Sequence, residues 1–264
     1  MKLKACIRSM RLRTIPLSLS GVVMGTFIAA THQPLAAETV VLLLTTTALL
    51  QIISNLSNEL GDTLQGTDTA DRQGIRYPLQ DGDMTIPQMK RLIAIIVCCC
   101  ALSGLGMIVC SCGTLFGVEP LLLVLLGAAA ITAAMRYTLG KNPYGYRGWG
   151  DFYVFVFFGL VSVIGGYYIN THDLTNPLVL LPASAIGLFS IAVLNVNNIR
   201  DMKTDAANRW TAWLYLLTLP LYVKHLHGVW HRQDRELDPL LPLLVISTFA
   251  FTLLAGGGML LCAR

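Results

Sequence analysis

The sequence predicts an all-α protein that crosses a membrane as a bundle of helices, and three observations carry this prediction. The 264-residue chain is 54% hydrophobic and only 13% charged, and its mean hydropathy is +0.61. Apolar runs close to the roughly 20 residues that span a bilayer as a helix recur along it. A backbone inside a bilayer must satisfy its own hydrogen bonds, which favours helices. We therefore expect one integral-membrane domain over residues 1–264, in contact with lipid and not with nucleic acid.

Eight apolar runs predict eight membrane spans. No convincing cleavage site follows the basic N-terminal stretch, so the first run is expected to be a retained helix and not a signal peptide. The seventh run is the weakest, because about a dozen apolar residues rise only ~18 Å as a helix whereas the hydrocarbon core is ~30 Å thick. The predicted spans are 14–31, 38–54, 91–112, 120–137, 152–170, 177–197, 211–223 and 240–262.

Basic residues are distributed unevenly between the loops. If the N-terminus is cytoplasmic, loops 32–37, 113–119 and 171–176 lie outside, and none of them contains Lys or Arg. This is the positive-inside pattern, so we expect a multi-pass protein of the cell (inner) membrane with both acidic motifs on the cytoplasmic side. The intervening loops carry Arg72, Arg76, Lys90, Arg91, Arg136, Lys141, Arg147, Arg200, Lys203 and Arg209.

The pattern fails after the seventh run. Eight crossings would place residues 224–238, which include three basic residues, outside the cell. We hypothesise that residues 211–223 are re-entrant or packed against the bundle, so that this loop stays cytoplasmic. The alternative is that the three acidic residues of the same loop make its export tolerable.

The first acidic motif follows the second apolar run. Asn55, Asn58 and Asp62 have i, i+3, i+7 spacing, which places them on one face of a continuing helix. Ionisable groups beside a membrane span are functional by default, although a solvated acidic loop is the alternative. Carboxylate and amide oxygens are hard ligands that suit Mg²⁺.

Two glycines lie within this motif. We expect Gly61 and Gly66 to loosen the helix, so that Asp68 and Asp71 approach Asp62. The sequence thus predicts a cluster of carboxylates held together by a cation.

A second motif repeats the geometry at the end of the sixth run, where Asn198, Asp201 and Asp205 again have i, i+3, i+7 spacing. Two helices that deliver amides and carboxylates at one membrane depth can hold Mg²⁺ ions that bridge the oxygens of a diphosphate. The alternative is a pair of polar helix ends in contact with lipid headgroups.

The segments from Asn58 to Asp68 and from Asn198 to Asp205 resemble the two aspartate-rich motifs of the intramembrane aromatic prenyltransferase superfamily. The resemblance is closest to its menaquinone-pathway branch, the 1,4-dihydroxy-2-naphthoate polyprenyltransferases. R-L-R-T-I-P-L-S near the start and Y-G-Y-R-G-W-G-D-F from Tyr144 support that branch. The resemblance covers residues 7–208 and again from about 218 onwards.

The resemblance implies a bundle, usually of nine helices, around a central cavity that opens to lipid. It implies Mg²⁺-dependent transfer of a polyprenyl chain from its diphosphate to 1,4-dihydroxy-2-naphthoate, with loss of CO₂, giving demethylmenaquinone. Catalysis would rest on metal-binding Asp62, Asp68, Asp201 and Asp205, with Asn58 and Glu59 as further metal ligands. Substrate binding would involve Asn55, Asn58, Arg72, Arg136, Lys141, Tyr144, Arg147, Asn198 and Arg209.

Aromatic and basic side chains near the fifth span fit this chemistry. Arginine binds diphosphate oxygens in bidentate fashion, and aromatic faces stabilise an allylic cation. Headgroup contact is the alternative role for each basic residue, and membrane-interface packing is the alternative for the aromatic residues. The aromatic candidates are Tyr137, Tyr144, Tyr146, Trp149 and Phe152.

The chain departs from the family pattern in two places. Glu59 stands where Asp is usual, and Asn208–Arg209 runs directly into Trp210 where the family has a basic segment and a full seventh helix. We therefore expect a segment to be lacking near residues 206–213. Three alternatives stay open: prenyl transfer to another aromatic acceptor, a secondary transporter with coupling carboxylates near the bilayer midplane, and an inactive membrane protein.

Overall fold

The computed structural model describes residues 3–66 and 76–206, together with Pro220, Val223, Lys224, His227 and His231. Within 76–206, side chains are described as far as Asn195, except that of Arg147. The described residues form helices and loops with no strand, which confirms the predicted all-α class. The chain divides into two compact units, residues 1–197 and 198–264. The expectation of a single domain stays a prediction.

Twelve helical elements follow one another in the described part of the chain. Residues 155–161 form a π-helical segment within the longer helix 150–171. The elements are α1 (Leu3–Met10), η1 (Leu12–Thr14), α2 (Ile15–Ala30), α3 (Ala37–Gln65), α4 (Ile86–Cys112), α5 (Val118–Arg136), η2 (Tyr144–Arg147), α6 (Gly150–Val154), η3 (Phe155–Val161), α7 (Ser162–Thr171), η4 (Pro177–Val179) and α8 (Leu180–Ala206).

Among the described residues, six helical segments are long and apolar enough to cross a membrane, and they coincide with the first six predicted spans. They are Leu3–Ala30, Ala37–Gln65, Ile86–Cys112, Val118–Arg136, Gly150–Thr171 and Pro177–Asn195. The predicted eighth span, and the predicted seventh apart from Pro220 and Val223, lie outside the described residues.

The first span contains a break that the hydropathy pattern does not show. Arg11 has φ 48°, and this left-handed residue separates the short helix α1 from η1 and α2. On α1, Arg8 forms ion pairs with Asp81 (2.6 Å) and Asp83 (3.2 Å) of the loop before α4. The Arg11 guanidinium lies 3.7 Å from the ring centroid of Tyr77 in the same loop. The N-terminal segment is therefore fixed to the loop that follows the first motif.

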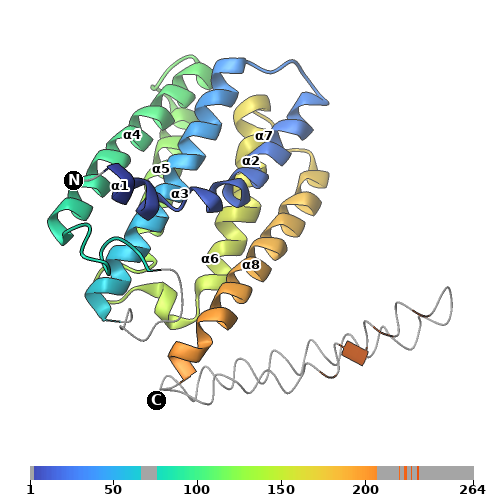
Figure 1. Cartoon of the computed structure of the whole chain (residues 1–264). Helices are drawn as coiled ribbons and strands as arrows, with labels where there is room; N and C mark the ends of the chain where they lie inside the picture. The colour runs from blue at the N-terminus through green and yellow to red at the C-terminus, as the bar shows by residue number, and fades with distance from the viewer. Residues whose placement is uncertain are drawn as a thin grey trace. The chain divides into compact units, whose positions relative to one another are not determined.

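Helix α3 is the centre of the N-terminal unit, and it packs against α4, α2, α5 and α1 (Figure 1). Ile53 and Leu56 of α3 and Met89 of α4 are fully buried in the main apolar cluster. Loops 31–36 and 113–117 lie at the upper end of the view in Figure 1, and residues 137–149 lie at the lower end. Successive spans thus run in alternate directions.

Glycines allow two close helix contacts. A Cβ on Gly25 of α2 would lie 2.2 Å from the Val163 carbonyl oxygen of α7. A Cβ on Gly166 would lie 2.9 Å from the Val22 carbonyl oxygen, and one on Gly159 would lie 2.6 Å from the Ala183 carbonyl oxygen of α8. Small residues let helices in lipid approach closely, which is the role of these three glycines.

Candidate active site

The first motif lies in the last turns of α3. The helix carries Asn55, Asn58 and Asp62 without interruption and ends at Gly66, whose φ of 67° closes the C-terminus. The prediction that Gly61 loosens this helix is wrong. A Cβ on Gly61 would lie 2.5 Å from Cβ of Thr138, so this glycine is needed for a close packing contact and not for flexibility.

Thr138 also forms hydrogen bonds to the first motif and so fixes its position. Its Oγ1 donates a hydrogen bond to the Ser57 carbonyl oxygen (2.8 Å) and lies 3.2 Å from Oδ1 of Asn58. Thr138 is buried and lies two residues after the end of α5. The end of α5 therefore positions the amide of Asn58.

Asp62 is contacted by the loop after α5, which also contains Thr138. The hydroxyl of Tyr146, in η2, donates a hydrogen bond of 2.5 Å to Oδ1 of Asp62. Asp62 is half-buried, whereas Tyr146 is exposed. The carboxylate is thus held at the edge of the bundle, where an external ligand can reach it.

The side chain of Asn55 is directed to the N-terminal segment. It is buried, and its Nδ2 donates to the Met10 carbonyl oxygen and to Oγ1 of Thr14, both at 2.9 Å. Its Oδ1 accepts from Nε2 of Gln51 at 3.1 Å. These contacts join α3 to η1, and a substrate-binding role for Asn55 stays a prediction.

Glu59 faces the loop before α4. It is fully buried, and its Oε1 accepts a hydrogen bond of 3.0 Å from the Leu79 amide. Its charge also acts on the Arg8 guanidinium. Glu59 and Asp62 therefore interact with different loops, and a metal-binding role for Glu59 stays a prediction.

Two carboxylates act electrostatically on Tyr137. Burial raises the pKa of Tyr137 to about 12, and the negative charges of Asp151 and Asp62 add to the increase. Asp151 itself forms a hydrogen bond with Asn195 of α8. The Tyr137 hydroxyl is therefore neutral at physiological pH and lies in the electrostatic field of the first motif.

A row of aromatic rings leads from this point into the fifth span. Tyr144 meets Tyr137 edge to face, with centroids 5.4 Å apart, and stacks on Tyr153 at 3.9 Å. Tyr153 is parallel to Phe157 at 6.2 Å. The Tyr144 hydroxyl donates to the Ala133 carbonyl oxygen at 2.7 Å, and the pKa of Tyr144 is raised, mainly by burial. These four rings, Tyr137, Tyr144, Tyr153 and Phe157, are called the aromatic row below.

The remaining predicted aromatic residues lie at the edge of this row. Trp149 and Phe152 meet edge to face at 5.9 Å, and Phe152 meets Tyr153 edge to face at 5.7 Å. Trp149 and Phe152 are both more than half exposed, which fits a position at the surface of the bundle.

The predicted basic residues are only partly described. Arg136 at the end of α5 and Lys141 in the following loop are exposed, and Arg147 ends η2. Asn198, Asp201 and Asp205 lie on the described backbone of α8, with side chains outside the described set. Asp68, Arg72 and Arg209 lie outside the described residues.

Sequence reasoning missed three residues that build the site: Thr138, Asp151 and Tyr153. Thr138 follows Tyr137 and Asp151 precedes Phe152, both of which were singled out, and Tyr153 continues an aromatic run. The i+4 spacing of Tyr153 and Phe157 is a signal for a shared helix face. The contact between Gly61 and Thr138 joins positions 77 residues apart in the chain, and no local pattern predicts it.

The described part of the first motif fits a hard divalent cation. Asp62 supplies a half-buried carboxylate and Asn58 an amide oxygen. The atoms that these two side chains direct to their partners are oxygens, which Mg²⁺ prefers over nitrogen and sulfur.

Comparison with known proteins gives a consistent result. The chain matches the UbiA prenyltransferase family over residues 18–211. It is 37% identical to the 1,4-dihydroxy-2-naphthoate octaprenyltransferase of Escherichia coli, over 90% of this chain and 87% of the relative. It is 33% identical to the protein of that name from Haemophilus influenzae, over 98% of this chain and 97% of the relative. No solved structure matches the chain.

Proposed function

Because the chain belongs to the UbiA prenyltransferase family, we propose that it transfers a polyprenyl chain from its diphosphate to 1,4-dihydroxy-2-naphthoate. Two relatives that bear the name of this activity align with most of the chain. The structural observation that supports the proposal most is the position of Asp62, at a helix end beside the aromatic row. The alternative of a coupling carboxylate at the bilayer midplane is not favoured by that position.

Prenyltransferases of this family generally depend on a divalent metal ion, and we propose that the ion is Mg²⁺. Asn58 and Asp62 would hold it together with Asp68, Asp201 and Asp205, and Glu59 is a further candidate. Bound Mg²⁺ would neutralise the negative charge that develops on the diphosphate as the allylic carbon–oxygen bond breaks. Arg72, Arg136, Lys141, Arg147 and Arg209 are proposed to bind the remaining diphosphate oxygens, as are Asn55 and Asn198 through their amides.

The described side chains around Asp62 keep it in place for this task. Tyr146 donates to one carboxylate oxygen, and Thr138 fixes Asn58 one helical turn earlier. Because the pKa of Tyr137 is about 12, its hydroxyl stays protonated and adds no negative charge beside the two carboxylates. The Tyr137 hydroxyl thus adds no third negative charge to Asp62 and Asp151.

The aromatic row is proposed to face the allylic cation. Its ring faces are negatively polarised and would stabilise the cation. Tyr144 is anchored through its hydroxyl to the Ala133 carbonyl oxygen, which fixes the ring against Tyr153.

The reaction at the acceptor ring needs no general base, because CO₂ leaves the ring in place of a proton. The bond between the allylic carbon and the diphosphate oxygen breaks, and a bond to the carboxylate-bearing ring carbon forms. The bond from that ring carbon to the carboxylate then breaks, and its electron pair restores the aromatic ring. The products are diphosphate, CO₂ and the reduced form of demethylmenaquinone.

The several apolar spans make the chain a multi-pass membrane protein. We propose that it lies in the cell membrane with the N-terminus and both motifs in the cytoplasm. The absence of Lys and Arg from loops 32–37, 113–119 and 171–176 supports this orientation.

The alignment lengths support a shortened bundle. The alignment with the Haemophilus influenzae relative extends over 304 positions, whereas this chain has 264 residues. At least 40 aligned positions are therefore gaps in this chain. A membrane helix with its loops takes up roughly 20 residues or more, so gaps of this total length support the proposal that the chain lacks a segment. Its proposed place near residues 206–213 rests on the departure from the family pattern at Asn208–Arg209.

An acceptor panel tests the proposal. Membranes that contain the full chain are supplied with a polyprenyl diphosphate, Mg²⁺, and either 1,4-dihydroxy-2-naphthoate or a monocyclic hydroxybenzoate, and the lipid products are identified by mass spectrometry. We expect a prenylated product that has lost CO₂, with the naphthoate only. Prenylation of the hydroxybenzoate alone would assign another aromatic acceptor, and no product with either would indicate an inactive protein.

A further inference from the structure

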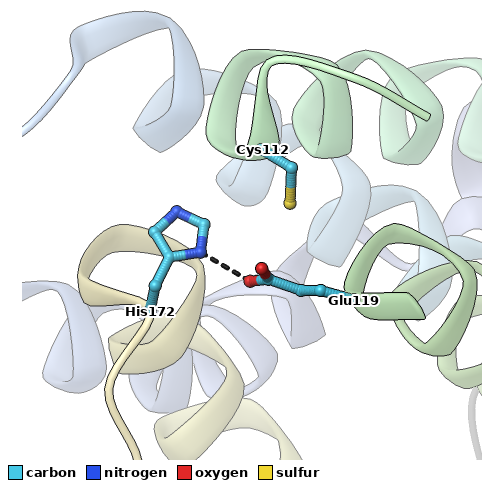
Figure 2. Close-up of side chains that lie close together, drawn as sticks. All are labelled: Cys112, Glu119 and His172. Carbon is cyan, nitrogen blue, oxygen red and sulfur yellow. Dashed lines mark hydrogen bonds and ion pairs between the residues drawn. The ribbon is translucent and has the colours of Figure 1, made fainter. Parts of the chain in front are cut away.

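Three side chains of types that can ligate a metal ion meet at the end of the N-terminal unit opposite to Asp62. Cys112 is the last residue of α4, Glu119 lies in the first turn of α5, and His172 follows α7. One potential ligand atom of each lies within 4.8 Å of the other two. Figure 2 shows the imidazole, the carboxylate and the sulfur directed toward a common point from three separate helices.

The backbone fixes the imidazole in this position. His172 has φ 55°, a left-handed conformation that is uncommon for a residue other than glycine. Its amide donates a hydrogen bond of 2.7 Å to the Tyr168 carbonyl oxygen, which ends α7. The unusual backbone at the helix end therefore directs the ring back over Glu119.

The contacts of His172 determine which ring nitrogen carries a proton. Its Nε2 lies 3.1 Å from the carbonyl oxygen of Ser111 and 3.2 Å from Oγ of the same residue. Oγ of Ser111 donates its own proton to the Ile169 carbonyl oxygen at 2.6 Å, so toward Nε2 it accepts. Both partners of Nε2 are acceptors, and Nε2 therefore carries the proton.

This assignment leaves Nδ1 of His172 facing a carboxylate. Nδ1 lies 2.6 Å from Oε1 of Glu119, and that oxygen already accepts a hydrogen bond of 2.8 Å from the Tyr168 hydroxyl. In the neutral imidazole, Nδ1 would carry a lone pair directed at an anionic oxygen. A positively charged species must therefore lie between Nδ1 and Oε1, and it is either a second proton on the ring or a metal ion.

We propose that Cys112, Glu119 and His172 form a binding site for Zn²⁺. Thiolate, imidazole nitrogen and carboxylate oxygen are all ligands of Zn²⁺, whereas Mg²⁺ takes oxygen ligands. Bonds of about 2.0–2.1 Å to nitrogen and oxygen place those atoms about 3.3 Å apart in a tetrahedral site. The present 2.6 Å contact would widen slightly, Cys112 would move inward, and water would take the fourth position.

The surroundings fit this site. Metal-bound histidine usually donates its other ring N–H to a carbonyl or carboxylate, as Nε2 does here to Ser111. The Tyr168 hydroxyl supports the carboxylate of Glu119 in the same way. Loops 113–119 and 171–176 contain no Lys or Arg that would compete for the anionic ligands. The bound ion would join the ends of α4, α5 and α7.

Cobalt substitution tests the site with a readout that does not depend on activity. The full chain, purified in detergent with excess Mg²⁺ to fill the oxygen-rich motifs, is titrated with Co²⁺ and then with Zn²⁺. We expect one Co²⁺ per chain with a sulfur-to-metal charge-transfer band and the intense visible bands of tetrahedral geometry. Zn²⁺ should abolish this spectrum at one equivalent.

Matched variants locate the binding. Cys112→Ser is expected to remove the charge-transfer band, and His172→Gln to weaken binding at least tenfold, since each removes a ligand. Cys110→Ser, which changes an exposed cysteine on the same helix, should bind like the unchanged chain. Variants with both His227 and His231 replaced should also bind normally. Thermal unfolding without metal checks that each variant folds.

Two results would overturn the proposal. One is a charge-transfer band that persists in Cys112→Ser, or that is lost equally in Cys110→Ser. The other is the lack of stoichiometric Co²⁺ and Zn²⁺ binding by the folded chain, which would show that a second proton on His172 is the positively charged species between Nδ1 and Oε1.

Discussion

The hydroxyl of Tyr146 donates a hydrogen bond of 2.5 Å to Oδ1 of Asp62 and so joins the loop after α5 to the last turns of α3. The two residues are 84 positions apart in the chain. Together with the bond from Thr138 to the Ser57 carbonyl oxygen, this contact makes the end of the first motif a fixed structure. The geometry explains how Asp62 can be exposed to a ligand and yet held in one orientation.

Tyr146→Phe is expected to weaken Mg²⁺ binding at the site without abolishing prenyl transfer. A hydrogen bond to a charged acceptor contributes about 1.5–3 kcal/mol. Tyr146 is 46% exposed, so we expect about 1 kcal/mol here, which is roughly a fivefold effect. The Mg²⁺ concentration for half-maximal activity should rise by about this factor, as measured by a Mg²⁺ titration of product formation.

Tyr167→Phe is the matched control for that change. It also removes a tyrosine hydroxyl that donates to an aspartate, because Tyr167 contacts Oδ2 of Asp173 at 3.2 Å at the other end of the fifth span. Its Mg²⁺ titration should match that of the unchanged chain. If Tyr146→Phe gives that same curve, the hydrogen bond has no positioning role.

Gly61→Ala is expected to destabilise the protein. The new Cβ would lie 2.5 Å from Cβ of Thr138, and overpacking of this kind costs about 1–3 kcal/mol. Gly127→Ala is the control, because a Cβ there meets nothing within 4 Å, and alanine favours the helix by up to about 1 kcal/mol. Thermal unfolding in detergent should place Gly61→Ala below the unchanged chain and Gly127→Ala at or above it. The opposite order would contradict the packing account of Gly61.

Tyr137 should give the folded state a stability that depends on alkaline pH. Its pKa is raised to about 12, from about 10 in an unfolded chain. Since the folded state holds the proton more tightly, the contribution is fully present below about pH 10 and is lost as the pH rises toward 12. The unfolding temperature should therefore fall more steeply over this range in the unchanged chain than in Tyr137→Phe. Parallel curves would show that Tyr137 titrates normally.

Much of the fold was predictable from the sequence because hydropathy is a local property. The first six spans follow from apolar runs, and the end of α3 at Gly66 follows from the conformational freedom of glycine. The break at Arg11 was not predictable. It depends on contacts of the N-terminal segment with Tyr77 and with Asp81 and Asp83, which are distant in sequence.

The candidate site was likewise only partly predictable from the sequence. The spacing of Asn58 and Asp62 predicted a shared helix face, but not their contacts with Thr138 and Tyr146. The cluster of Cys112, Glu119 and His172 had no signal in the sequence. Its members belong to three helices with no short motif between them, and only packing brings them together.

The topology of the C-terminal region gives a further prediction, which rests on the sequence because Gly228 lies outside the described residues. A cysteine placed at Gly228 in a chain without other cysteines should resist an impermeant thiol reagent added to intact cells, since loop 224–238 is expected to be cytoplasmic. Leu115→Cys, in a predicted outside loop, should label strongly. Asn142→Cys, in a predicted inside loop, should not. Labelling at Gly228 as strong as at Leu115 would establish eight crossings.

Asp62 and Asp201 are proposed to hold Mg²⁺ for prenyl transfer to the naphthoate, and one assay tests this role most directly. Membranes with the unchanged chain, Asp62→Asn, Asp201→Asn or the control Asp173→Asn receive labelled polyprenyl diphosphate and 1,4-dihydroxy-2-naphthoate, with Mg²⁺, Ca²⁺ or a chelator. We predict product with Mg²⁺ only, a loss of at least about 100-fold in both motif variants, and full activity in Asp173→Asn, at equal membrane levels. Normal turnover in Asp62→Asn, or equal turnover with the chelator, would contradict the account.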